Sequence, residues 1–160
     1  GNTAALSAVQ CYYHTNKQTR IDLTVAIPRS FNVKVHDGSG EIIISKVADT
    51  VINDGSGSIT ANDITGTLEI NDGSGSIEAR NISRDIKIHD GSGNIDVANA
   101  QGNIEVHDGS GGIDLNDISG DVVVSDGSGS IRVDTAANFE LLHDGSGSVK
   151  VTNLDGKTKY

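Results

Sequence analysis

The tetrapeptide Asp-Gly-Ser-Gly recurs seven times, and this repeat constrains the fold more than any other feature of the chain. The first two copies begin 17 residues apart, and the later ones follow every 18 residues. Repetition at a fixed period is typical of proteins in which one structural unit stacks on the next. The copies begin at Asp37, Asp54, Asp72, Asp90, Asp108, Asp126 and Asp144.

Each 18-residue unit divides into two nonapeptides that share one template. Residues 72–80 read DGSGSIEAR and residues 81–89 read NISRDIKIH. Four turn-forming residues precede five residues that alternate between polar and apolar, a pattern that predicts a short strand with one buried face. We therefore expect two five-residue strands in every unit.

The apolar positions of successive units fall into columns. The first nonapeptide supplies two columns: Ile42, Ile59, Ile77, Ile95, Ile113, Ile131 and Val149, then Ile44, Ala61, Ala79, Val97, Leu115, Val133 and Val151. The second supplies Leu68, Ile86, Ile104 and Val122, then Ile52, Ile70, Ile88, Val106, Val124 and Leu142. An additional inward position is expected in the second turn, at Ile64, Ile82, Ile118 and Leu154.

These columns predict an all-β, single-stranded parallel β-solenoid with two short strands per 18-residue coil. Five-residue strands are too short to form hairpins with their own cores, so equivalent strands should stack from coil to coil, about 4.8 Å apart. Parallel connections favour a right-handed coil. Because aromatic residues make up only 3% of the chain, stacked Leu, Ile and Val must fill the core.

Two segments depart from the template. Residues 46–53 are one residue short. Residues 135–143 place Glu140 where an apolar residue is expected, and a bulge there would instead turn Phe139 and Leu141 inward.

The ends of a solenoid need cover, because exposed strand edges pair with other chains. We assign residues 1–36 to an N-terminal cap and a first irregular coil, and residues 37–160 to the repeats of the same single domain. At the C-terminus, either Lys157, Lys159 and Tyr160 cover the last coil or a second subunit does, as a homodimer through the terminal coil.

The net charge of −10, from 12 basic and 22 acidic residues, disfavours binding to nucleic acid or to an anionic membrane surface. No apolar run reaches the roughly 18 residues that span a bilayer. We expect no membrane insertion of this segment, and Gly1 in place of a methionine suggests a processed or trimmed chain.

The run RIDLTVAIPRSFNVKVHDGSGEIIIS and the recurring DGSGSI units resemble a bacterial adhesin family of β-strand repeats, a domain of unknown function. The resemblance spans residues 19–156 and is similar in pattern to the proposed head domains of autotransporter adhesins. It implies a β-solenoid and an extracytoplasmic location: periplasmic, outer-membrane-associated or secreted. It provides no catalytic residues.

The column of turn aspartates allows two interpretations. Each carboxylate can accept a hydrogen bond from the backbone of the serine two residues on, forming an Asx-turn, while the glycines supply positive φ. Alternatively the column binds calcium, as β-rolls of two nonapeptides per coil do. The sixth-position aspartate of that motif is replaced here by Ile77, Ile95 and Ile113.

Four histidines precede turn aspartates, and His89 and His107 should be neighbours in adjacent coils. Imidazoles beside carboxylates can bind zinc, whereas stacked polar residues at the outer end of a strand explain the same pattern without metal. The candidate metal ligands are Asp72, Asp90, Asp108, Asp126, His89 and His107.

We expect no enzymatic activity and no cofactor other than calcium. Ser, His and Asp recur identically in the turns, so no copy is marked as a triad, and no long insertion builds a cleft. The sequence favours a cell-envelope or surface protein, adhesin-like, that presents a rigid acidic repeat face to an unidentified protein or glycan partner. The alternative is a calcium- or zinc-binding module built on the aspartates and histidines.

Overall fold

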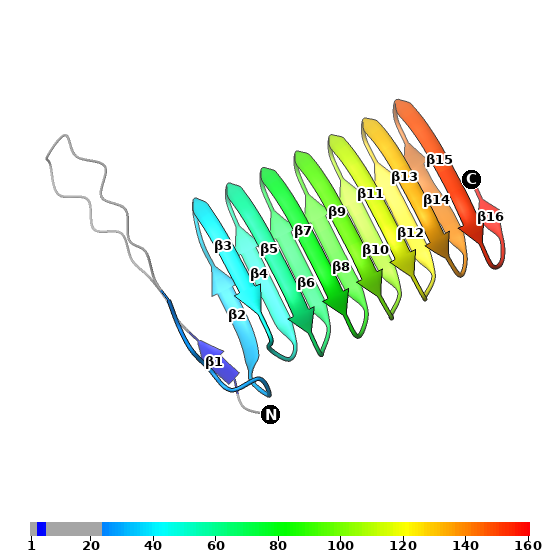
Figure 1. Ribbon diagram of the computed structural model, residues 1–160. Helices are drawn as coiled ribbons and strands as arrows, with labels where there is room; N and C mark the ends of the chain where they lie inside the picture. Colours follow the sequence, from blue (N-terminus) through cyan, green and yellow to red (C-terminus); the bar gives the residue numbers. More distant parts are fainter. Residues whose placement is uncertain (1–2, 6–23) are drawn as a thin grey trace, which may run out of the picture.

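The computed structural model, which describes residues 3–5 and 24–160, is a parallel β-solenoid of about seven coils (Figure 1). Within these residues all regular structure is β-strand, and no helix could cross a membrane. One sheet contains β3 (Gly40–Ser45), β5 (Gly57–Ile64), β7 (Gly75–Ile82), β9 (Gly93–Ala100), β11 (Gly111–Ile118), β13 (Gly129–Ala136) and β15 (Gly147–Leu154). The second sheet contains β1 (Thr3–Ala5), β2 (Asn32–His36), β4 (Thr50–Asp54), β6 (Leu68–Asp72), β8 (Ile86–Asp90), β10 (Ile104–Asp108), β12 (Val122–Asp126), β14 (Phe139–Asp144) and β16 (Thr158–Lys159).

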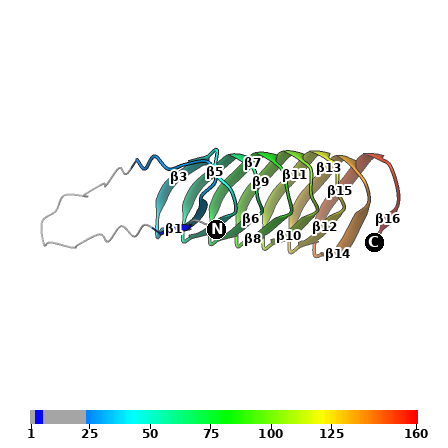
Figure 2. The same ribbon diagram turned by 90° about the horizontal axis from the view of Figure 1, so that it is seen from below.

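The chain alternates between the two sheets, so each coil contributes one strand to each. Every strand pairs in parallel with the strand of the same sheet in the next coil, and equivalent residues are Cα partners: Ile77 with Ile95, and Ile88 with Val106. Figure 2, seen from below, shows the strands of the first sheet along one side of the stack and those of the second sheet along the other. This confirms the predicted solenoid with two strands per coil.

The core is an aliphatic seam between the sheets. The predicted columns are buried in the central coils: Ile59, Ile77, Ile95, Leu68, Ile86, Ile52, Ile70, Ile88 and Val106 are at most 2% exposed. Ile64, Ile82 and Ile118 of the second turn are equally buried, as predicted. Inside the core, each isoleucine or valine packs on its counterpart in the next coil, so neighbouring side chains interlock, and Phe139 is the one aromatic residue among the described core residues.

The strands of the first nonapeptide are longer than the five residues predicted. β5, β7, β9, β11, β13 and β15 each have eight residues and continue through a residue with positive φ. Asn81 and Asn99 occupy that position with φ of 58°, and the strand then delivers Ile82 or Ala100 into the core. Asparagine tolerates this left-handed conformation, which explains its use there.

The segment before the last coil contains the predicted bulge. The pairing of β12 with β14 shifts register between Val124 and Ser125. Phe139 is therefore 1% exposed and Leu141 packs against the core, whereas Leu142 is 56% exposed. The assignment of Leu142 to the inward column was wrong, because the extra residue of the bulge turns its side chain outward.

Both irregular segments lose one residue from the same turn. Two residues separate Val47 from Thr50 and Ala136 from Phe139, where three separate Ile64 from Leu68. In the second case the bulge restores the missing residue, so the 18-residue spacing of the turns is unchanged. The first deviation is confined to one edge, whereas the second also places a bulge in the pairing of β12 with β14.

The last coil is only half covered. β16 pairs with β14, and the ring of Tyr160 lies edge-on to Phe139 at 6.4 Å. No described residue pairs with the outer edge of β15, and Val149 and Val151 there are only partly buried. The predicted N-terminal cap is described at residues 3–5 and 24–36, where β1 extends the second sheet past β2, and the rest of it lies outside the described residues.

The two glycines of each turn are required for different reasons, whereas the sequence predicted positive φ for both. Gly93 has a φ of +146°, but Gly91 does not have positive φ. A Cβ atom on Gly91 would lie 2.5 Å from the carbonyl oxygen of Gly73 in the preceding coil. Only glycine allows the turns to stack this closely.

We expect Gly91→Ala to lower the free energy of unfolding by about 1–3 kcal/mol, because the coils must separate locally to admit the methyl group. The control is Gly112→Ser. Gly112 occupies the column of Ser76 and Ser130, and a Cβ there comes no closer than 3.2 Å to Asn94. Urea unfolding of both variants tests this, and equal loss of stability in both would contradict it.

Candidate functional site: the aspartate and histidine ladders

A column of carboxylates lies inside the edge formed by the Asp-Gly-Ser-Gly turns. Each of these aspartates is the last residue of a strand of the second sheet, and consecutive ones are Cα partners. Their side chains are between 0% and 8% exposed, so they face inward rather than toward solvent as turn residues usually do. We call this column the aspartate ladder: Asp54, Asp72, Asp90, Asp108 and Asp126.

One oxygen of each ladder carboxylate forms the predicted Asx-turn. The Oδ1 atom of Asp90 accepts a hydrogen bond from the backbone N–H of Ser92 at 3.2 Å, and Asp108 accepts one from Ser110 at 3.0 Å. Asp54, Asp72 and Asp126 make the same contact. The Oδ2 atom of all five is buried and has no hydrogen-bond donor. The Asx interpretation is confirmed, but it satisfies only half of each carboxylate.

Burial makes the charged form unfavourable at four of these carboxylates, Asp54, Asp90, Asp108 and Asp126. It raises the pKa of Asp90 from 3.8 to about 6, an effect opposed by the Ser92 hydrogen bond and increased by the charges of Asp108 and Asp72. Burial likewise raises the pKa of Asp54, Asp108 and Asp126. In-register stacking therefore holds like charges in the same column, about 4.8 Å apart, where little water reaches them.

The residues just before the ladder form a second column on the outer face of the sheet. The rings of His89 and His107 stack at a centroid distance of 4.8 Å with 5° between their planes. Burial, the His107 ring and the Lys87 ammonium together lower the pKa of His89. Asn53, Asn71 and Ser125 continue this column, and the Asn71 amide donates to Asn53 Oδ1 at 3.3 Å.

Glu105 links the stacked histidines to the outward column that contains Lys87. Its Oε1 atom lies 2.8 Å from His107 Nε2 and 3.3 Å from Lys87 Nζ. These two hydrogen-bonding partners lower the pKa of Glu105. The carboxylate thus stays ionised and compensates the positive charge of Lys87 beside the imidazoles.

The two columns predicted as metal ligands face opposite sides of the sheet. His89 and His107 are stacked on the outside, whereas Asp72, Asp90, Asp108 and Asp126 are stacked inside. Across residues 3–5 and 24–160 no group of three or more His, Cys, Asp or Glu side chains is placed to hold one metal ion. Metal binding at these six residues therefore stays a prediction, and the histidines and aspartates would not share a metal.

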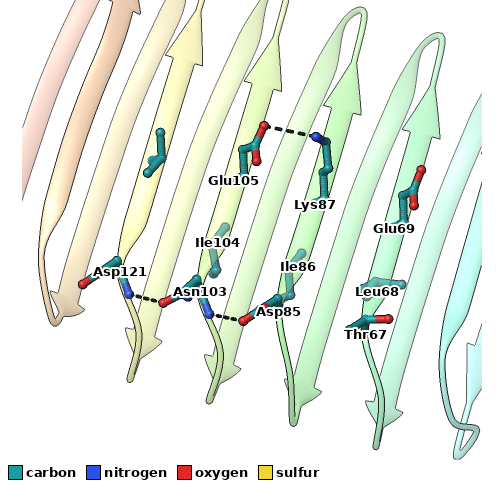
Figure 3. Close-up of a pocket in the computed structure, with 11 residues that line it drawn as sticks. Thr67, Leu68, Glu69, Asp85, Ile86, Lys87, Asn103, Ile104, Glu105 and Asp121 are labelled. Atoms are coloured by element: carbon teal, nitrogen blue, oxygen red, sulfur yellow. Dashed lines mark hydrogen bonds and ion pairs between the residues drawn. The ribbon is translucent and has the colours of Figure 1, made fainter.

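A third ladder, at the opposite edge, has no counterpart in the sequence analysis. Side-chain oxygens there accept the backbone N–H of the equivalent residue in the next coil: Asp85 from Asn103, and Asn103 from Asp121, both at 2.9 Å (Figure 3). Asp or Asn at the same position in successive units was the available signal. The hydrogen bonds show that these exposed carboxylate and amide side chains hold neighbouring coils together.

This ladder borders a shallow hollow on the outer face of the second sheet, over the start of β6, β8, β10 and β12 (Figure 3). Glu69, Lys87, Glu105 and Val123 cross it as one outward column. Charges of both signs and an aliphatic side chain line the hollow, and its lining includes no nucleophile held by a histidine. The hollow is therefore a part of the outer face that carries charges of both signs and a partly exposed aliphatic side chain.

Stacked in-register strands, interior carboxylates and short turns place the chain in the class of parallel β-solenoid repeat domains. The family model Toastrack DUF4097 matches residues 5–159, so the chain belongs to the Toastrack family, a domain of unknown function. No curated protein and no solved structure matches the chain. The match confirms the expected repeat family of unknown function, and it does not confirm a similarity to adhesins.

We expect His107→Gln to raise the pKa of His89 toward its ordinary value of 6.5, because the variant removes a positive neighbour that disfavours the imidazolium. A titration of the His89 ring by NMR measures this shift. Glu105→Gln is the matched control and should move the His89 pKa the other way, since the Glu105 charge raises it. A His89 pKa unaffected by either change would refute the coupling.

Proposed function

We propose that this Toastrack domain is a non-enzymatic structural and interaction module, adhesin-like in use, that presents a rigid acidic face to a partner. The observation that carries the proposal is the outer face of the first sheet, where three carboxylates follow one another in register. Glu78 is the Cα partner of Asp96, and Asp96 of Asp114. We call these three residues the acidic row.

The acidic row is exposed and held in place. The side chains of Glu78, Asp96 and Asp114 are 46–47% exposed. Arg80 Nε lies 2.5 Å from Glu78 Oε1, and its Nη2 atom lies 3.5 Å from Asp96 Oδ1. Because side chains on a stacked sheet keep a regular spacing, a partner with matching cationic groups could engage several rungs at once.

Rigidity favours an interaction role over catalysis. Between β3 and β15 the connections are two to four residues long, and the pairing of the first sheet runs without a register shift. Such a stack has no hinge and no insertion that would close over a substrate. Within our proposal the partner is a protein or glycan at a bacterial surface, and the domain works outside the cytoplasm, in the cell envelope or secreted.

The half-covered last coil supports a second contact, with another copy of the chain. β15 presents a free backbone edge in the described structure, and Val149, Val151 and Leu154 behind it are only partly buried. Pairing two such edges would cover both the backbone groups and the end of the core. We propose a homodimer through this terminal coil.

Attachment assays test the interaction role. We expect Asp96→Asn/Asp114→Asn to weaken attachment of cells that carry the protein, because it removes two charges from the acidic row. The matched control is Glu69→Gln/Glu140→Gln, which removes two charges from the opposite outer face and should leave attachment unchanged. If cells that lack the whole gene attach as well as wild-type cells do, the proposal is wrong.

Sedimentation velocity tests the dimer. We expect Val151→Lys to shift the protein toward monomer, because a charge then occupies the end of the core that the second copy would bury. Lys150→Glu changes the outward position of the same strand and serves as the control for folding. A wild-type protein that stays monomeric at all concentrations measured would overturn the dimer.

A further inference from the structure

The aspartate ladder contains buried polar atoms that the proposed interaction function does not explain. The Oδ2 atoms of Asp54, Asp72, Asp90, Asp108 and Asp126 are buried and unpartnered, in side chains that are more than nine-tenths buried. A buried oxygen without a donor is costly, and more so when it carries charge. Five such atoms in one column are too regular to be an accident of packing.

The groups that face the ladder do not neutralise it. Asp90 is influenced by Asp72 and Asp108, and Asp54 by Asp72 and Asp37. Asp126, at the other end, is influenced by Asp144, which raises its pKa, and by His143, which lowers it. His89 and His107 precede ladder residues in the chain, but they stack on the outer face. For Asp54, Asp90 and Asp108 the charged groups that act on the carboxylate are therefore other aspartates.

A neutral ladder would fit the same place. An asparagine keeps a side-chain oxygen for the serine N–H, and its amide can donate to the next coil. The chain uses such neutral ladders elsewhere, since the amide of Asn71 donates to Asn53, and that of Asn99 to Asn81. All seven units nevertheless carry aspartate at the start of the turn. This choice points to a property that a carboxylate has and an amide lacks, namely titration.

We propose that the aspartate ladder is a proton-binding column, which takes up protons as the surroundings acidify and thereby stabilises the stack of coils. A protonated rung is neutral, so it removes the repulsion with both neighbours and gives its buried oxygen an O–H. Because adjacent rungs interact, their protons are shared by the column rather than bound independently. The stack of coils would then be more stable against unfolding in acid than at neutral pH.

The direction of the effect follows from the raised carboxyl pKa values. The unfolded chain binds these protons only near pH 3.8, whereas the folded chain binds one at Asp90 near pH 6. Between these values folding takes up protons, so stability is greatest in acid and is lost as the pH rises through about 6.

Other groups limit the useful pH window. The pKa of His89 is lowered in the fold, so its contribution has the opposite sign and is lost as the pH falls. The pKa values of Glu105 and Asp134 are also lowered, and their contributions are lost below their usual values of 4.5 and 3.8. The ladder is therefore best measured between about pH 8 and pH 5, with these groups unchanged in every variant.

The experiment compares thermal unfolding of wild type and two variants at pH 8 and pH 5. We expect the wild-type midpoint to be about 5 °C higher at pH 5. Asp90→Asn/Asp108→Asn should unfold at a higher temperature than wild type at pH 8 and gain less than half as much at pH 5. The control is Asp85→Asn, an exposed aspartate of the other turn whose oxygen also accepts a backbone N–H, and it should behave as wild type.

A second measurement does not depend on how the variants fold. Side-chain carboxyl NMR shifts of the wild-type protein should show Asp90 and Asp108 titrating above the ordinary aspartate value of 3.8. Titration of both residues at that ordinary value would overturn the proposal. So would a calcium-dependent rise of the wild-type midpoint at pH 8 that the Asp90→Asn/Asp108→Asn variant lacks, because the ladder would then hold metal ions rather than protons.

Discussion

In-register hydrogen bonding between parallel strands is the interaction on which the rest of this structure depends. A parallel ladder with an 18-residue repeat places every residue directly over its counterpart in the next coil, about 4.8 Å away. Where the repeat is exact, the size, polarity and charge of a side chain therefore recur at the same position in the next coil, so each residue contacts a residue of the same kind. Isoleucine and valine gain from this arrangement, since branched side chains interlock, and glycine gains because only it permits the turns to approach.

The same constraint makes charge difficult to place. On the outer faces, columns relieve repulsion by mixing signs, as with Lys87 beside Glu105 or Arg132 beside Asp114, and by crossing to the next column, as Arg80 does toward Glu78. These pairs are exposed, so each contributes little to stability. Inside the turns the ladder aspartates lie next to one another, and burial raises the pKa of Asp54, Asp90, Asp108 and Asp126.

The positions at which the chain departs from the repeat follow the same logic. The turns beside Val47 and Phe139 are each one residue shorter, yet side-chain hydrogen bonds still join them to the preceding coil. Asn32 accepts the backbone N–H of Asp49, and the Asn138 amide donates to Asp121. An extra residue in β14 appears as Leu142, turned out to solvent, because a one-residue slip of the whole strand would expose its entire apolar face. Changes in the length of a coil are accommodated by a shorter turn or by a bulge, and the apolar columns of the other strands keep their register.

The sequence alone determined the solenoid, its two strands per coil and its buried columns, because periods of 18 and of two are visible in the order of residues, and it offered the Asx-turn as one of two interpretations of the aspartate column. It also indicated the bulge near Glu140 but could not choose between Leu142 and its neighbours. Only the tertiary structure decided which way each polar side chain faces. Asp90 and His89 are adjacent in sequence, yet one is buried and the other is stacked outside, because consecutive residues of a strand face opposite sides. The unpartnered Oδ2 atoms and the raised carboxyl pKa values follow from that burial, a property of the assembled coils that no single repeat contains.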